Sequence, residues 1–282
     1  MKLAFVTPTY RGDYERCKLL CESTSRFLPK DSEHILIVDQ RDISFFKGLE
    51  NSTVRIVVSE SLMPWWIFRL PGVKKWSFSL RTLPIRNWIY QQLLKISSVY
   101  ATDADIIQFI DSDVTLIRPF PLDYIHKNDR FRLQRVNYID PDQKKWANTA
   151  ATLLGVEIPD DFHYSYVGNL ITWTRPNILG LIERLEEVAK SSWVSAVGNQ
   201  VYFSEYMLYG IYVDYVLGIE ASGQYHDDSP NLHLCWDYDL RTQQGMKQFF
   251  SEINPDNLGI MIHSKYNIPV ELYRDHVKSL FV

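Results

Sequence analysis

The chain has 282 residues, of which 46% are hydrophobic, and a formal net charge of −4. This length and apolar content suffice for one large domain or two small ones. The slightly acidic balance excludes an overall basic field that would draw the protein onto nucleic acid, so any anionic ligand needs a local cluster of basic residues. No apolar run approaches the roughly 20 residues of a membrane span.

The first half of the chain alternates predicted strands with predicted helices. Strands are indicated at KLAFVTPTY (2–10), HILIVDQRD (34–42), VRIVVSE (54–60) and DIIQFIDSD (105–113). Apolar residues recur with helical spacing over 13–28 and 83–100. Alternation of this kind predicts an α/β protein with a parallel sheet that is covered by helices on both faces.

The second half is more varied. GNLITWTRP (168–176) predicts a strand, 177–190 a helix, and NQVYFSEYMLYG (199–210) an aromatic-rich helix that has Glu205 in its middle. Strands are predicted at YVDYVLGI (212–219) and LGIMIHSKY (258–266), and a short amphipathic helix at 270–282. Nothing in these patterns requires a second domain, so one domain over residues 1–282 is expected.

The three cysteines are spaced neither as a disulfide framework nor as a metal knuckle. Two of them lie four residues apart in a predicted helix, and the third is remote: Cys17, Cys21 and Cys235. Reduced, partly buried thiols are the expectation. The N-terminal stretch LAFVTPTY is too short for the apolar core of a signal peptide. A cytoplasmic location is therefore expected, and peripheral membrane attachment stays open.

Polar groups follow several predicted strands. They are Thr7-Pro8-Thr9-Tyr10, Asp39, Asp111-Ser112-Asp113 and His263. Ligands of open α/β sheets bind beyond the carboxyl ends of the strands, so we expect these groups to meet at one edge of the sheet.

Asp111 and Asp113 stand at the end of a buried apolar strand. Two carboxylates repel each other, and burying them is costly unless a cation or hydrogen-bond donors compensate. A divalent metal is one explanation, and a nucleophilic aspartate is the other.

The nucleophile hypothesis rests on FIDSDVTL, which fits the Asp-x-Asp-x-Thr pattern of haloacid-dehalogenase-type phosphatases. Asp111 would be the nucleophile and Asp113 the acid. That family carries this motif on the first strand of its core and needs a later acidic pair at a strand end. Here a complete α/β half precedes the motif, and both later Asp-Asp pairs fall in predicted turns, at Asp160-Asp161 and Asp227-Asp228.

The metal hypothesis rests on signatures scattered over most of the chain. They are the VTPTY opening, Asp39 after the second strand, FIDSDV, the Gly-Asn pair before the strand at 170, a helix bearing Glu205, and a late HSK. In this order they resemble the nucleotide-sugar-dependent glycosyltransferases of the GT-A fold. The resemblance implies one domain with a Rossmann-like mixed central sheet, helices on both faces, a nucleotide-binding half (1–117) and an acceptor-side half (118–282).

The same resemblance implies a metal-dependent glycosyltransferase. Its donor would be a nucleoside diphosphate sugar, with a UDP-sugar favoured, and its acceptor a glycan, a lipid-linked sugar or a small molecule. Mn²⁺ or Mg²⁺ would be held by Asp111, Asp113 and His263, and imidazole suits Mn²⁺ better. A non-catalytic relative that binds sugar nucleotides is the remaining alternative.

The nucleotide would lie against Thr7, Pro8, Thr9, Tyr10, Asp39 and Ser112, with Tyr10 stacked on the base. The diphosphate needs positive charge beyond the metal. Arg69, Lys74, Lys75, Arg81 and Arg86 form a basic run, and Lys265 follows the late histidine. Arg86 and Lys265 are the predicted diphosphate contacts, since Arg86 lies at a helix start, where the dipole disfavours a cation unless an anion is near.

The sugar side is expected from the aromatic segments of the second half, at Tyr166, Gly168, Asn169 and Tyr206. Glu205 is the single acid in the second of these segments, and partial burial would raise its pKa toward that of a useful base. An acidic residue at this place in the resembling family is the base of inverting members. Inversion is therefore favoured, while retention without a protein base stays open.

Overall fold

The computed structural model describes residues 1–70, 72–73 and 75–281, so Lys74 lies outside the described residues. The central sheet has the strand order β11 (Leu170–Thr174), β7 (Ile106–Ile110), β1 (Leu3–Thr9), β2 (Glu33–Val38) and β3 (Val54–Val58). The last four strands are parallel, and β11 runs antiparallel to β7. The predicted mixed sheet is confirmed.

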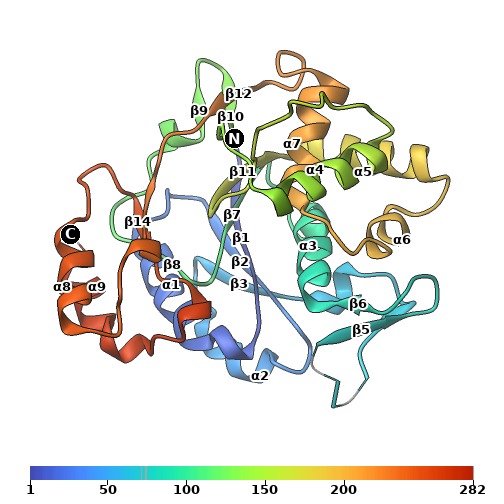
Figure 1. Cartoon of the computed structure of the whole chain (residues 1–282). Helices are drawn as coiled ribbons and strands as arrows, with labels where there is room; N and C mark the ends of the chain where they lie inside the picture. The colour runs from blue at the N-terminus through green and yellow to red at the C-terminus, as the bar shows by residue number, and fades with distance from the viewer. Residues whose placement is uncertain (71, 74, 282) are drawn as a thin grey trace.

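Both faces of this sheet are covered by helices (Figure 1). Side chains alternate along a strand, so Ala4 and Val6 pack against one helical layer, and Leu3 and Phe5 against the other. The first layer contains α3 (Asn87–Ser97), α4 (Pro141–Leu154), α5 (Arg175–Ala189), α6 (Trp193–Gly198) and α7 (Glu205–Ile211). The second contains α1 (Tyr14–Phe27), α8 (Gln243–Ser251) and α9 (Arg274–Ser279). The short helix α2 (Ile43–Phe46) follows β2.

Three smaller sheets surround the central one. They are β12 (Gln224–Asp227) with β10 (Arg130–Gln134) and β9 (His126–Lys127), β13 (Leu232–Leu234) with β14 (Gly259–Met261) and β8 (Val114–Leu116), and β4 (Ile67–Phe68) with β5 (Trp76–Ser79) and β6 (Ile85–Arg86). No helix among the described residues is long and apolar enough to cross a membrane.

The antiparallel pair of β8 and β14 positions the late histidine. β8 follows Asp113 directly, and Met261 on β14 pairs with Val114 on β8. Gly259 allows this pairing, because a Cβ there would stand 2.6 Å from the carbonyl oxygen of Thr115. A backbone atom cannot turn aside as a side chain can, so the close approach requires glycine.

We expect Gly259→Ala to destabilise the protein by about 1–3 kcal/mol, the usual cost of overpacking. Urea denaturation measures this loss. Gly48→Ala is the matched control, because a Cβ at that position meets nothing within 4 Å. Equal stabilities of the two variants would contradict the prediction.

One predicted helix of the second half begins later than expected, and one predicted strand was wrong. The stretch 199–204 is not helical, and α7 begins at Glu205 because the hydroxyl of Ser204 caps the helix by accepting from the N–H of Met207. The predicted strand at 212–219 is instead a π-helix, Tyr212–Leu217, which continues α7 and ends at Gly218 with φ 79°. A short apolar run of this kind does not distinguish a strand from a buried helix.

Candidate active site

The two aspartates lie in the turn that joins β7 to β8. The side chain of Asp111 is 36% exposed, and Ser112 is buried. Burial and the charge of Asp111 raise the pKa of Asp113 to about 7, although the N–H of Ser264 donates to Asp113 Oδ2 at 3.1 Å. The hydrogen bond from Ser264 therefore does not offset the cost of a charged Asp113 that is buried beside Asp111.

His263 lies next to Asp113, as the sequence predicted. The N–H of Ile262 donates to the Asp113 carbonyl at 3.1 Å, so the histidine directly follows a residue bonded to the aspartate. The two meet through β8 and β14, however, and not along the central sheet. Burial and the charge of Lys265 lower the pKa of His263, which favours the neutral ring.

Lys95 of α3 is a central residue that the sequence analysis did not single out. Its ammonium lies 3.2 Å from Asp111 Oδ1 and 3.1 Å from Glu205 Oε1, and it donates to the hydroxyl of Tyr206 at 2.7 Å. Burial alone would lower the pKa of Lys95, but the charge of Asp111, the interaction with Tyr206 and the charge of Glu205 outweigh it and raise that pKa well above its usual value. This buried cation therefore links α3, α7 and the end of β7.

Asp13 and Arg16, at the start of α1, lie close enough to the aspartate pair to affect it. Arg16 Nη1 lies 3.3 Å from Asp13 Oδ1, and both side chains are 12% exposed. Burial raises the pKa of Asp13, and the charge of Asp111 acts in the same direction, while Arg16 and Ser112 oppose the rise. Among the described residues, the four carboxylates of Asp13, Asp111, Asp113 and Glu205 thus outnumber the basic side chains of Lys95, Arg16 and Lys265 near them.

The site fits a divalent cation in charge and in donor type. Carboxylate oxygens and a neutral imidazole are suitable ligands for Mn²⁺, and a doubly charged ion would offset the excess of carboxylates. The ligands are not yet arranged around one point, because no three His, Cys, Asp or Glu side chains among the described residues form a metal-binding group. His263 Nδ1 accepts from the Lys265 N–H at 3.1 Å, so ligation by this ring would displace that contact or move the ring proton.

Glu205 is the first residue of α7, not a mid-helix residue as predicted. It is 4% exposed, and its N–H donates to Gln92 Oε1 at 2.9 Å, so α3 holds both the backbone and the carboxylate of this residue. The predicted role of Glu205 as a general base stays a prediction. Any such role must begin from a carboxylate that is paired with Lys95.

The nucleotide contacts predicted at the end of β1 stay predictions, and the side chains there have structural partners. Thr7, Pro8 and Thr9 are buried in the sheet, and the Thr7 hydroxyl donates to the Ile110 carbonyl at 2.6 Å and lies 2.9 Å from His34 Nε2. Their side chains support the strand. Tyr10 is different, because it is 51% exposed and remains available to stack on a base.

Asp39 is also engaged within the protein. Its carboxylate lies 2.9 Å from Arg41 and 2.9 Å from Arg69. Burial acts to raise the pKa of Asp39, but the hydrogen bonds from Arg41 and the charge of Arg69 outweigh it and lower the pKa. A nucleotide contact of Asp39 would have to compete with two guanidinium groups.

The predicted diphosphate residues Arg86 and Lys265 both have exposed side chains. Arg86 precedes α3, and its guanidinium lies 5.5 Å from the centre of the Trp76 ring. Lys265 follows His263 in a short 3-10 helix. Their role at a diphosphate stays a prediction.

The residues predicted to contact sugar fall into two groups. Tyr166 and Tyr206 are 2% and 5% exposed and belong to the core, and their sugar contacts stay predictions. Gly168 and Asn169 are half-buried and immediately precede β11. Since Leu170 pairs with Ile110, this loop lies beside the Asp111 turn.

Tyr166 takes part in a buried polar network. Its hydroxyl donates to Asp214 Oδ2 at 2.5 Å, His226 Nε2 lies 2.7 Å from Asp214 Oδ1, and Arg135 lies 3.2 Å from Oδ2. Burial acts to raise the pKa of Asp214, but these hydrogen bonds and charges outweigh it and lower the pKa.

Because the folded-state pKa of Asp214 is depressed, its contribution to stability is present above the unfolded value of about 3.9. That contribution is lost as the pH falls from there through the folded-state pKa. We expect the urea midpoint of wild type to fall more steeply below about pH 4 than that of Asp214→Asn. Parallel curves for the two proteins would show that Asp214 does not carry the acid sensitivity.

The phosphatase hypothesis finds little support in these positions. The Asp-Ser-Asp motif follows β7, whereas the first strand of the core is β1. Of the later acidic pairs, Asp160 and Asp161 lie in a turn, and Asp227 lies 3.4 Å from the buried guanidinium of Arg132. Neither pair presents two open carboxylates beside Asp111.

Solved structures show where this fold occurs elsewhere. The crystal structure of an active-site mutant of LgtC is similar with a TM-score of 0.50 and 11% sequence identity, over 99% of this chain and 95% of that chain. Two further structures are similar at a lower level. The galactosyltransferase LgtC with donor and acceptor sugar analogs has a TM-score of 0.47 and 10% sequence identity, over 100% of this chain and 97% of that chain. The apo form of mouse xyloside xylosyltransferase 1 has a TM-score of 0.47 and 8% identity, over 95% of this chain and 100% of that chain. The likeness to the LgtC mutant confirms the GT-A glycosyltransferase fold expected from the sequence.

At the level of sequence, no curated protein matches this chain. A family of unknown function, DUF6492, matches residues 3–280, which is nearly the whole chain. The protein therefore belongs to the DUF6492 family.

Proposed function

We propose that this protein transfers a sugar from a nucleoside diphosphate donor to a carbohydrate or glycolipid acceptor, with UDP as the favoured nucleotide. The observation that carries the proposal is the Asp111–Asp113 pair, set beside His263 at the carboxyl edge of β7 with more carboxylates than basic groups around it. The GT-A fold supports the same reading.

Asp111, Asp113 and His263 are the residues proposed to hold Mn²⁺ or Mg²⁺. When bound, the ion would stabilise the negative charge that develops on the departing diphosphate. Tyr10 offers an exposed ring to the base, and Arg86 and Lys265 are the proposed cations for the phosphates. Gly168 and Asn169 lie beside Asp111, where the donor sugar is expected.

We further propose that Glu205 is the base of an inverting transfer. It is supported by the burial of Glu205 and by the Lys95 ammonium, which connects it to Asp111. The anomeric configuration of the product, read by NMR, tests this proposal, because retention of configuration rules out a general base in this position.

Thermal unfolding with nucleoside diphosphates, each with and without Mn²⁺, tests the donor and the metal together. A ligand that binds only the folded state adds about 2.7 kcal/mol at a hundredfold excess over its dissociation constant. We expect the largest shift for UDP with Mn²⁺ and little shift for uridine. Shifts that are the same with and without metal would overturn the metal proposal.

Metal-dependent hydrolysis of the donor sugar separates an enzyme from a non-catalytic relative. The substrate is the sugar nucleotide whose nucleoside diphosphate gives the largest thermal shift. Without an acceptor, an enzyme is expected to hydrolyse it slowly and release free sugar. Binding without any release would favour the non-catalytic alternative. The cytoplasmic location expected from the sequence stays a prediction.

A further inference from the structure

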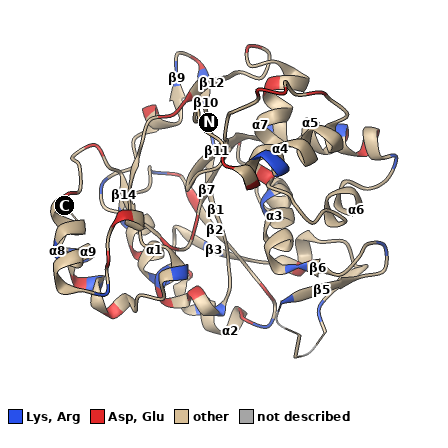
Figure 2. Cartoon of the chain, viewed as in Figure 1, with Lys and Arg blue, Asp and Glu red and all other residues tan. Residues whose placement is uncertain are grey.

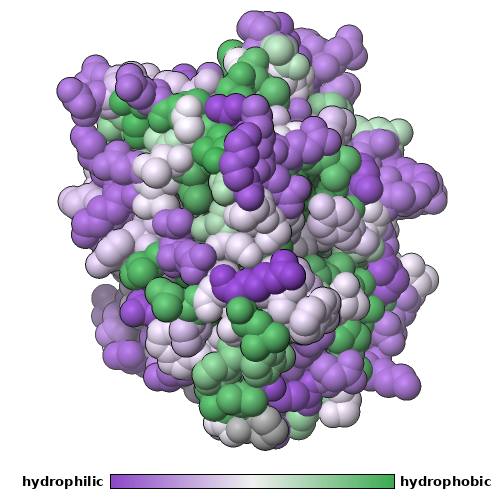
Figure 3. Space-filling view, turned by 90° about the vertical axis from the view of Figure 1, so that its right-hand side faces the viewer, coloured by the Kyte–Doolittle hydropathy of each residue, from purple (hydrophilic) through white to green (hydrophobic). Residues whose placement is uncertain are grey.

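The small sheet β4–β5–β6 and the loops beside it expose large apolar side chains. Trp65 is 79%, Leu80 66%, Leu83 67% and Val201 53% exposed, and Phe68 and Trp76 are more than one third exposed. We call residues 65–88 together with 199–202 the hairpin surface, of which residues 71 and 74 are not described. Figure 3 shows hydrophobic surface gathered in the lower part of this side of the molecule, next to the grey atoms.

The hairpin surface is basic, although the protein as a whole is acidic. No acidic residue occurs in the sequence between Glu60 and Asp103, whereas five Lys and Arg residues lie between positions 69 and 86. Arg69 pairs with Asp39, while Lys75, Arg81 and Arg86 have exposed side chains. Blue residues along the β5 hairpin mark this region in Figure 2.

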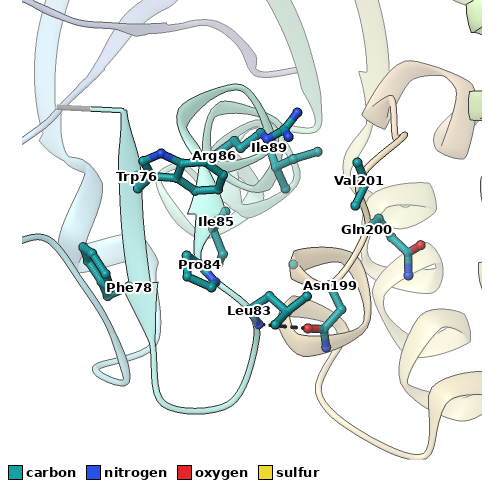
Figure 4. A pocket seen from close by; sticks show the side chains of 11 residues that line it. Trp76, Phe78, Leu83, Pro84, Ile85, Arg86, Ile89, Asn199, Gln200 and Val201 are labelled. Atoms are coloured by element: carbon teal, nitrogen blue, oxygen red, sulfur yellow. Dashed lines mark hydrogen bonds between the residues drawn. The ribbon is translucent and has the colours of Figure 1, made fainter. Parts of the chain in front are cut away.

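An apolar groove of about 430 Å³ lies within this surface. One wall comes from β5, β6 and the start of α3, the other from residues 198–201, and the N–H of Leu83 joins the walls by donating to Asn199 Oδ1 at 3.1 Å (Figure 4). Trp76, Phe78, Pro84, Ile85, Ile89 and Val201 are among the lining residues. The single charged lining residue among those described is Arg86.

We propose that the hairpin surface docks on an anionic lipid bilayer. Tryptophan and leucine side chains interspersed with Lys and Arg are the composition of membrane-interface segments, in which apolar groups enter the headgroup region and basic groups meet lipid phosphates. The groove, whose lining is mainly apolar, offers a place for part of an acyl chain. A second copy of this chain fits poorly, because pairing two such surfaces would oppose basic residues of like charge.

The docking can be tested apart from the proposed transfer reaction, because none of the residues replaced in the vesicle test below is proposed to bind the donor. It would nevertheless orient the site. α3 begins at the groove and carries Lys95 nine residues after Arg86, which is roughly 14 Å along a helix axis. A docked molecule would hold its carboxylate cluster close to the lipid headgroups.

Cosedimentation with vesicles tests the proposal without any measurement of activity. Wild type is expected to bind vesicles of phosphatidylcholine with phosphatidylglycerol, to release them at high salt, and to bind pure phosphatidylcholine far more weakly. Two double variants separate the apolar from the basic contribution. Trp65→Ser with Leu83→Ser removes apolar side chains, and Lys75→Gln with Arg81→Gln removes positive charges. Each is expected to lower the partition coefficient at least about tenfold.

Leu122→Ser and Leu272→Ser are the matched controls, because these leucines are 48% and 56% exposed and lie outside the hairpin surface. They are expected to bind vesicles as wild type does, and circular dichroism checks that all variants fold. Absence of vesicle binding by wild type, or equal binding by all variants, overturns the proposal. Self-association in sedimentation velocity that the Trp65→Ser, Leu83→Ser pair abolishes would overturn it in favour of a second copy.

Discussion

Replacing Asp113 by asparagine is expected to lower metal-dependent turnover of the donor by at least about 10²-fold, as does removal of a group that stabilises transition-state charge. Asparagine keeps the size of the side chain and an oxygen that can accept from the Ser264 N–H. The fold should therefore survive while the negative charge is lost. The measurement is the rate of UDP release at saturating Mn²⁺.

The same variant is expected to lose activity but to gain stability. Burial and Asp111 disfavour the charged form of Asp113, so the neutral amide is expected to raise the free energy of unfolding in metal-free buffer. Asp256→Asn is the control, since Asp256 is an exposed aspartate outside the carboxylate cluster. A variant that turns over like wild type, or that loses stability and activity together, contradicts a charge-based role for Asp113.

Replacing Lys95 by methionine is expected to cost about 3–5 kcal/mol, the usual effect of removing one partner from a buried ion pair. Methionine has a similar length, so the loss is mainly that of charge and hydrogen bonds. Glu205, 4% exposed, would be left without its cation. Urea denaturation at neutral pH measures the change.

A second substitution tests the cause of this loss. Lys95→Met combined with Glu205→Gln removes the stranded carboxylate and is expected to recover a large part of the stability. Lys278→Met serves as the control, because its pair with Glu22 at 2.7 Å is 43% and 35% exposed and such surface pairs contribute about 0–1 kcal/mol. Similar losses at both lysines, or no recovery in the double variant, would show that the charge of Lys95 is not what holds α7 to α3.

Most strands of the central sheet could be predicted because burial on both faces requires mainly apolar residues. β1, β2, β7 and β11 are short, mainly apolar runs that are buried almost throughout. β3, at the edge of the sheet, is only partly buried and contains the exposed Arg55. The edge at which Asp39 and Asp111 emerge follows from the parallel order of the strands. The same argument led to the expectation that Asp113 and His263 lie together, but the structure brings them together differently, through the antiparallel pair of β8 and β14 outside the central sheet.

Other parts of the site depend on contacts between remote segments, which periodicity does not report. Lys95 falls in a helix that was predicted, but its burial comes from α7 and the end of β7. The sequence did contain one signal for this role. Lys95 is the only charged residue in α3, a helix that is buried almost all round, and an isolated lysine in such a helix needs acidic partners. Thr7 is the converse case. Its position at the end of a strand predicted a nucleotide contact, but its hydroxyl lies 2.9 Å from His34 Nε2 inside the sheet.

α4 was missed although its ends carry clear signals. Asp140 accepts hydrogen bonds from the N–H groups of residues 142 and 143, Pro141 occupies the first turn, and Gly155 ends the helix with φ 61°. The weak apolar period of PDQKKWANTAATLL hid it. End signals deserve the same weight as periodicity when a helix is rich in alanine.

The reversed strand β11 has a consequence for how this fold can diversify. Because Leu170 pairs with Ile110, the chain that leaves β7 at the aspartate turn returns to its starting point before β11 begins. The whole excursion over 111–169 is thus closed at its base by one ladder. Lengthening a closed loop costs only about 0.6 kcal/mol for each doubling. Insertions in this excursion could therefore reshape the mouth of the site in related chains while the residues at its base keep their register.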